Sequence, residues 1–161
     1  MQIFKYDIVF QEVPHHISLA FYVCGCPLKC PGCHSTELWS EKNGYKLDIP
    51  LFNEIIDRYH DRITTVLFLG GEWRESELIE FLKTARERNL LTAFYTGAAD
   101  ASPALKSHLD FLKVGPWRRE LGGLDSPSTN QIFYDLKNNR ILNHLFQREH
   151  NKEIPHDPTH P

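Results

Sequence analysis

Hydrophobic residues along the chain form short, dense apolar runs that alternate with longer stretches of helical spacing. Residues 17–24 (ISLAFYVC) are almost wholly apolar, which is typical of a strand buried on both faces of a parallel sheet. In residues 74–89, apolar side chains share one face and charges fill the other, which predicts an amphipathic helix. The same patterns predict further strands at 2–10, 63–69, 91–96 and 111–114, helical segments at 49–61 and 103–108, and a closing hairpin of 131–136 with 140–145.

The alternation of strands and helices in the middle of the chain predicts an α/β fold. Such βαβ units build a parallel sheet with helical cover. A chain of 161 residues is too short for a full eight-fold barrel of about 250 residues, so we predict a partial, open β/α barrel with a mainly parallel sheet. One domain is expected over residues 1–149. The tail, 150–161, carries three prolines and three histidines and is expected to be disordered.

Composition and charge narrow the classes of partner and compartment. The hydrophobic fraction of 41% and the charged fraction of 24% are ordinary for a globular protein. The net charge is −3 and no basic block stands out, so neither nucleic acid nor an anionic membrane is an expected partner. No apolar run approaches the roughly 20 residues of a membrane helix, and the first residues lack a secretory signal. A cytoplasmic location is therefore expected, where thiols stay reduced.

All four cysteines lie within residues 24–33, which favours a metal or redox site over a disulfide framework. Cys26, Cys30 and Cys33 form a C-x3-C-x2-C motif, with proline and glycine residues that bend the chain. Thiolates at this spacing can wrap one iron–sulfur cube. Three cysteine ligands leave one iron open, as in a catalytic metal site, and S-adenosylmethionine can chelate that iron through its amino and carboxylate groups.

Cys24 leaves two alternatives open. It is either a fourth ligand or a small buried hydrophobe, and we favour the second interpretation. A structural zinc knuckle with four cysteine ligands is the alternative for the whole site. Zinc sites usually pair two C-x2-C knuckles or add separated histidines, so the motif favours a [4Fe–4S] cluster.

The sequence resembles radical S-adenosylmethionine enzymes, and more closely the activating proteins of anaerobic ribonucleoside-triphosphate reductase. The resemblance extends from about Tyr6 to Leu145. Several segments carry it together: the Cys motif continuing through His34-Ser35-Thr36-Glu37-Leu38-Trp39, then Gly70-Gly71-Glu72, Tyr95-Thr96-Gly97, Val114-Gly115-Pro116-Trp117 and Ser128-Thr129-Asn130-Gln131.

The resemblance implies an oxidoreductase that activates a glycyl-radical enzyme. A cluster held by Cys26, Cys30 and Cys33 would cleave S-adenosylmethionine reductively, and the 5′-deoxyadenosyl radical would take hydrogen from a glycine of the large reductase subunit. The implied partners are that large glycyl-radical subunit and a flavodoxin-like or other one-electron donor. The protein supplies binding, orientation and shielding for the cofactor.

The resemblance also implies cofactor-binding residues. Gly70 and Gly71 would let the backbone approach the methionine moiety, and Glu72 would hold the turn or balance charge. Gly32 and His34 flank the last ligand on the implied adenine side, while Thr96 and Gly97 are implied on the ribose side. Each has a structural alternative: a tight turn, an exposed loop acid, a surface histidine or a simple strand exit.

Three departures mark a divergent subgroup. The family's Gly-Pro-Gly and Arg stretch is replaced by residues 10–17, the glycine turn continues as Gly-Gly-Glu-Trp rather than Gly-Gly-Asp-Pro, and the late Asp-Gly pair is replaced by Val114-Gly115. Two further functions stay open. One is a small radical S-adenosylmethionine enzyme acting on another substrate. The other is a non-catalytic electron-transfer protein, for which Cys24 is the only cysteine left to serve as fourth ligand.

Overall fold

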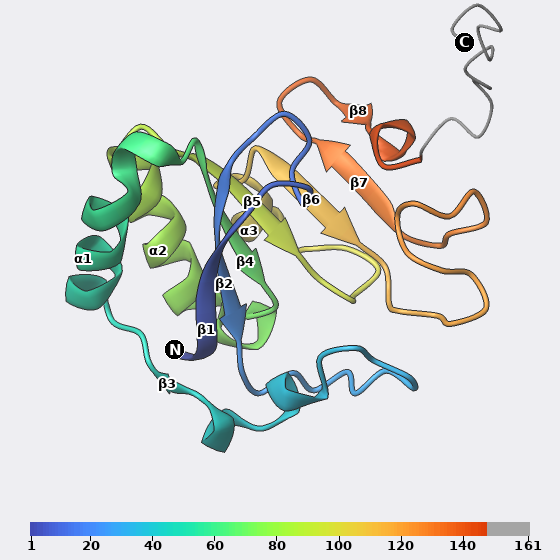
Figure 1. Ribbon diagram of the computed structural model, residues 1–161, viewed down its shortest axis with the longest axis horizontal. Coiled ribbons are helices and arrows are strands. Elements are labelled where there is room, and N and C mark those ends of the chain that lie inside the picture. Colours follow the sequence, from blue (N-terminus) through green and yellow to red (C-terminus); the bar gives the residue numbers. More distant parts are fainter. Residues whose placement is uncertain (148–161) are drawn as a thin grey trace, which may run out of the picture.

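Eight strands form one mixed sheet, in the order β3-β1-β2-β4-β5-β6-β7-β8, in a computed structural model that describes residues 1–147 (Figure 1). The predicted tail, 150–161, lies outside the described residues. The strands are β1 (Gln2–Val9), β2 (Ser18–Val23), β3 (Tyr45–Lys46), β4 (Thr65–Leu69), β5 (Leu91–Tyr95), β6 (Phe111–Val114), β7 (Ile132–Asp135) and β8 (Arg140–Ile141). The α-helices are α1 (Ile49–Tyr59), α2 (Glu75–Glu87) and α3 (Pro103–Lys106), and short 3-10 helices are η1 (Thr36–Trp39), η2 (Glu41–Asn43), η3 (His60–Arg62), η4 (Glu72–Arg74) and η5 (Asn143–Leu145).

The predicted partial β/α barrel with a mainly parallel sheet is wrong. Only the pairs β2–β4, β4–β5 and β5–β6 are parallel, whereas β1–β2, β1–β3, β6–β7 and β7–β8 are antiparallel. A parallel pair requires a crossover of about a dozen residues or more, and the chain makes such crossovers only in its middle. The chain reverses direction between β1 and β2, between β6 and β7 and between β7 and β8, and β3 returns after the Cys segment to pair antiparallel with β1. The βαβ pattern was therefore a property of the central strands alone.

Most predicted helices and strands are present with small shifts at their ends. α1 begins where proline and an N-cap residue predict it, because the Asp48 side chain accepts a hydrogen bond from the Leu51 N–H at 3.1 Å. The segment 103–108 forms only the single turn α3. The strand β3 and the 3-10 helices η1 and η2 follow the cysteines and were not predicted. Within residues 1–147, no helix is both long enough and apolar enough to cross a lipid bilayer.

The sheet has a core on each face. Successive β2 side chains alternate between them, so that Phe21 packs in the larger core and Ala20 in the smaller one. In the larger core, Phe21 and Phe68 stack at 5.2 Å between ring centroids beneath α1 and α2, which cover this face (Figure 1). On the other face, loop residues Val13 and Leu124 pack around Phe133. Burial of each such side chain contributes about 1.5–3 kcal/mol.

The loops that follow the four central parallel strands all begin at one edge of the sheet. Their register aligns Tyr22 with Leu69, Leu69 with Tyr95, and Tyr95 with Lys113. The carboxyl ends of β2, β4, β5 and β6 therefore meet at this edge. The segment that carries the cysteines leaves β2 and lies along the same edge (Figure 1).

Candidate metal centre

The Cys loop, defined here as residues 25–38, is closed by backbone hydrogen bonds. The N–H groups of Gly25 and Cys26 both donate to the Leu38 carbonyl, at 2.7 and 3.0 Å. Inside the loop, the Cys33 N–H donates to the Cys30 carbonyl at 3.1 Å, and the Ser35 N–H donates to Cys33 Sγ at 3.4 Å. An N–H directed at sulfur favours the thiolate, and hydrogen bonds to sulfur tune the potential of an iron–sulfur cluster.

The three thiols of the motif, Cys26, Cys30 and Cys33, are free and partly buried. Burial raises the pKa of the Cys26 thiol, while the backbone N–H groups of Leu28 and Lys29 lower that pKa and the charges of Glu72 and Cys30 raise it.

Cys24 faces a different part of the molecule. It is only 1% exposed, and its Sγ lies 3.0 Å from the position that a Cβ at Gly44 would take. Burial raises the pKa of the Cys24 thiol, with additional contributions from Glu37 and Glu41. Cys24 is thus buried beside Gly44, at the end of η2, and its assignment as a buried side chain rather than a fourth ligand stays a prediction.

Within residues 1–147, no group of three His, Cys, Asp or Glu side chains lies close enough together to hold a metal ion. Thiolates are the donors that iron–sulfur clusters take, and a four-iron cluster would bind Cys26, Cys30 and Cys33 each through a different iron.

The Gly70-Gly71-Glu72 turn follows β4 directly beside the Cys loop. Gly70 and Gly71 have φ values of +79° and +117°, a region that residues with a Cβ rarely adopt. A Cβ at Gly70 would lie 2.9 Å from Cη2 of Trp73, and one at Gly25 would lie 3.2 Å from Nε1 of the same indole. Trp73 therefore packs between the turn and the start of the Cys loop. Its indole lies close to both Gly70 and Gly25, which explains on structural grounds why glycine is found at these two positions.

Glu72 and Thr96 form a part-buried polar pair between the ends of β4 and β5. The Thr96 hydroxyl donates to Glu72 Oε1 at 2.7 Å and accepts from the Ala98 N–H at 2.9 Å. Thr96 is 3% exposed, and Glu72 Oε2 is buried without a hydrogen-bond partner in the described part of the chain. A buried carboxylate oxygen without a partner is costly, so this atom is an acceptor available to a ligand.

Lys113 is a further candidate residue, which the sequence analysis missed. Its Nζ donates to the Gly115 carbonyl at 2.9 Å, and burial lowers the pKa of Lys113 to about 8, with Cys30 and Glu72 acting in the opposite direction. The ammonium thus lies within the field of both the Cys loop and the Glu72 carboxylate. The detectable signal was a lysine inside the apolar run FLKV, directly before a Gly-Pro turn.

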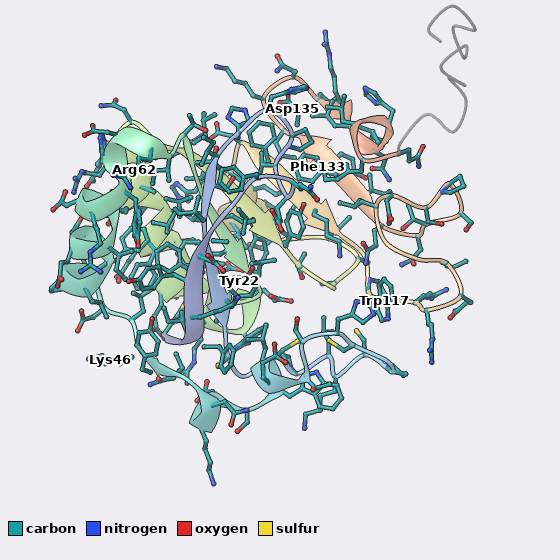
Figure 2. All side chains as sticks on the ribbon, viewed as in Figure 1. Tyr22, Lys46, Arg62, Trp117, Phe133 and Asp135 are labelled. Atoms are coloured by element: carbon teal, nitrogen blue, oxygen red, sulfur yellow. The ribbon has the colours of Figure 1, made fainter. Side chains whose placement is uncertain are left out.

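Gly97 contacts the Cys loop at Leu28, whereas Gly32 and His34, which belong to the loop, lie beside Trp117. A Cβ at Gly97 would lie 2.7 Å from Leu28 Cδ1, so the loop rests on the end of β5. The His34 ring packs against Trp117 with 4.4 Å between centroids, and a Cβ at Gly32 would lie 3.8 Å from Trp117 Nε1. Figure 2 shows Trp117 beside this loop. The structure therefore brings Glu72, Thr96 and Gly97 together, and places Gly32 and His34 with Trp117.

Three free thiols in a closed loop, with an N–H directed at one sulfur, are ligands of the kind that hold an iron–sulfur cluster. A family model described as 4Fe-4S single cluster domain matches residues 17–120. The chain belongs to this 4Fe-4S single cluster domain family. No curated protein matches the chain. The predicted cluster is confirmed at the level of the family, and the assignment of individual ligands stays a prediction.

Proposed function

We propose that the chain is a radical S-adenosylmethionine activating enzyme whose substrate is a glycine of the large subunit of anaerobic ribonucleoside-triphosphate reductase. The observation that supports this most is the pair of opposite charges next to the Cys loop, the part-buried Glu72 and the buried Lys113. Glu72 offers a carboxylate oxygen without a partner in residues 1–147, and Lys113 offers an ammonium near Cys30. The amino acid moiety of S-adenosylmethionine carries an amino group that can donate to Glu72 and a carboxylate that can pair with Lys113.

Cys26, Cys30 and Cys33 would hold the cluster in this proposal. The chemistry that the bound cluster supplies is one electron, which breaks the C5′–S bond of S-adenosylmethionine and leaves methionine and a 5′-deoxyadenosyl radical. Glu72 would accept hydrogen bonds from the amino group, while Lys113 would pair with the carboxylate. Thr96 holds the Glu72 carboxylate in place, so it acts as a positioning residue.

The sheet face that α1 and α2 leave free provides access for a protein substrate. A hollow of about 900 Å³ lies there, lined by Phe10, Glu12, Tyr95 and Gln131 among others. Tyr95 directly precedes Thr96, and its hydroxyl donates to the Glu12 carbonyl. The segment 10–17, which replaces the family's Gly-Pro-Gly stretch, therefore forms part of this hollow. We propose that the glycine-bearing segment of the reductase approaches from this side.

Anaerobic reconstitution with iron and sulfide tests the proposal. The expected product after reduction by dithionite in the presence of S-adenosylmethionine is 5′-deoxyadenosine, measured by chromatography. A Cys30→Ala variant is the matched control and should form none. Addition of the large reductase subunit should then give a glycyl radical by electron paramagnetic resonance. A fully assembled cluster that yields no 5′-deoxyadenosine would rule out the enzyme. Product without a glycyl radical would rule out the partner.

A further inference from the structure

The outer edge of β1 is unpaired over most of its length. β3 pairs with β1 only at Gln2 and Ile3. Within residues 1–147, no strand pairs with Lys5–Val9 on the side away from β2, and Figure 1 shows β1 near this end of the sheet. A row of unpaired backbone N–H and C=O groups is a template for a further strand.

The backbone groups of Tyr6 and Ile8 face this open edge. The Ile8 N–H donates to the exposed carboxylate of Asp7, with 2.9 Å between N and Oδ1, and so points away from β2. Backbone groups of alternate residues in a strand point the same way, so those of Tyr6 face the edge as well. Tyr6 and Ile8 are therefore the residues of β1 through which a further strand would pair.

Large apolar side chains are exposed at both ends of the open segment. Phe4 is 38% exposed and Tyr45 of β3 is 43% exposed at one end, while Phe10, directly after β1, is 67% exposed at the other. In a twofold pair of β1 strands, the Phe10 end of each copy lies beside the Phe4 and Tyr45 end of the other. Association would therefore remove these apolar side chains from water, as protein interfaces do.

The charges of β1 are self-complementary in one antiparallel register. Lys5 and Asp7 are exposed, and within one copy their side chains pair at 3.3 Å, an exposed ion pair that contributes little to stability. With Tyr6 opposite Tyr6 of a second copy, Lys5 of each copy lies opposite Asp7 of the other. The two nearest registers that keep the same backbone groups at the edge place Lys5 opposite Lys5 or Asp7 opposite Asp7. Like charges directly opposite are destabilising, so the pattern selects one register.

β1 also carries two features that protect edge strands from uncontrolled pairing, a bulge between Ile3 and Lys5 and charged side chains. Charges of a single sign would repel a second copy in every register. One lysine and one aspartate two residues apart repel in the shifted registers and attract in the centred one. The pattern therefore restricts pairing to one geometry and does not prevent it.

We infer that two copies of the chain form a twofold dimer in which the segments Phe4–Ile8 pair antiparallel, with Tyr6 opposite Tyr6. The inference does not depend on the proposed function. β3 occupies the edge at Ile3, which limits the new ladder to this segment. A contact of this length is small against the roughly 1,200–2,000 Å² of stable complexes, so the dimer is weak and depends on concentration. Because the paired strands run in opposite directions, the two Cys loops lie at opposite edges of the joined sheet.

Sedimentation velocity of the full-length, cluster-loaded chain under anaerobic conditions tests the inference. We expect a reversible monomer–dimer equilibrium between about 2 and 200 µM. Lys5→Asp and Asp7→Lys each place like charges opposite one another, and each should weaken self-association about tenfold or more. An equimolar mixture of the two variants should associate again, because the acidic side chains of one variant then lie opposite the basic side chains of the other.

Lys137→Asp is the matched control, since it makes the same charge change at an exposed position between β7 and β8. It should dimerise like the wild type. Hydrogen exchange of the wild type is a second measurement, which needs no substitution if a charge reversal disturbs folding. Peptides that cover Phe4–Ile8 should exchange more slowly at the higher concentration than at the lower, whereas peptides that cover β8 should exchange equally at both.

The outcomes separate this contact from other surfaces and from the proposed function. A wild type that remains monomeric up to about 200 µM would overturn the inference. So would a dimer that both charge reversals leave intact, equal weakening by Lys137→Asp, or a mixture of the two variants that does not associate. Charge-dependent dimerisation of a protein that forms no 5′-deoxyadenosine would support the β1 contact and refute the proposed enzyme.

Discussion

The Thr96 hydroxyl donates a 2.7 Å hydrogen bond to Glu72 Oε1 and joins the turn after β4 to the turn after β5. This bond leaves Oε2 of the same carboxylate buried and without a partner within residues 1–147. The pair is therefore half satisfied by the protein itself. It has a fixed orientation together with one open acceptor, which is the arrangement expected of a preorganised binding group.

Substitutions at this pair should weaken cofactor binding without loss of the cluster. Glu72→Gln removes the negative charge and should weaken S-adenosylmethionine binding at least tenfold, measured by calorimetry on reconstituted protein. Thr96→Val leaves buried polar groups unpaired and should cost about 1–3 kcal/mol in the free energy of unfolding as well. Thr96→Ser should restore both. Glu80→Gln, on the exposed face of α2, is the charge-matched control. Unchanged binding in Glu72→Gln would remove this carboxylate from the site.

The central part of the fold was predictable because its signals are local. A strand such as β2 has apolar side chains at nearly every position, and α2 has one apolar face, so each can be predicted from its own residues. The direction of strand pairing at the ends is not local. β7 returns antiparallel to β6 after the loop 115–131, and no periodicity within β7 encodes that direction. The prediction of a mainly parallel sheet failed for this reason.

The candidate site was predictable where a motif marks it and was missed where tertiary packing creates it. The cysteine spacing and the glycine pair are visible in the sequence. Lys113 becomes a site residue only because β6 lies next to β5 and brings its ammonium near Glu72 and Cys30. The separation of His34 from Thr96 likewise depends on the path of the Cys loop, with His34 packed on Trp117.

Cysteine substitutions should distinguish three ligands from one buried side chain. Alanine at Cys26, Cys30 or Cys33 should each abolish stable cluster binding, measured as iron and sulfide content and as visible absorbance. Cys24→Ser should retain the cluster, because the Cys24 thiol is buried against Gly44. Cluster loss in Cys24→Ser with an intact fold by circular dichroism would instead indicate a fully ligated electron carrier.

The turn after β4 should depend on glycine at position 70. Gly70→Ala would require a left-handed residue with a Cβ, which costs about 1–2 kcal/mol, and that Cβ would lie 2.9 Å from Trp73. We expect a loss of about 1–3 kcal/mol in the free energy of urea unfolding. Gly123→Ala is the matched control, because its nearest neighbour is the flexible Asp125 side chain at 3.1 Å. Equal stability of the two variants would contradict the packing of Trp73 on this turn.

His16 should make the fold sensitive to mild acid. Burial lowers the pKa of His16 below 6.5, with His15 acting in the same direction and Asp110 opposing it. The ring packs on Phe111 at 5.2 Å between centroids, and its Nδ1 lies 3.1 Å from Thr64 Oγ1. Because the folded pKa is below the unfolded one, the unfolded state takes up the proton first as pH falls. The free energy of unfolding should therefore decrease as pH falls below about 6.5.

Urea unfolding at pH 7.5 and at pH 5.5 measures this effect. His16→Gln should lose part of the decrease seen in the wild type, because it removes the group that takes up the proton on unfolding. Any loss of the contact with Thr64 affects both pH values equally, so the difference between them isolates the titration. His144→Gln, at an exposed position, should keep the wild-type difference. If His16→Gln also keeps the wild-type difference between the two pH values, the acid sensitivity arises from other groups. The His16 ring is then accessible to protons in the folded protein.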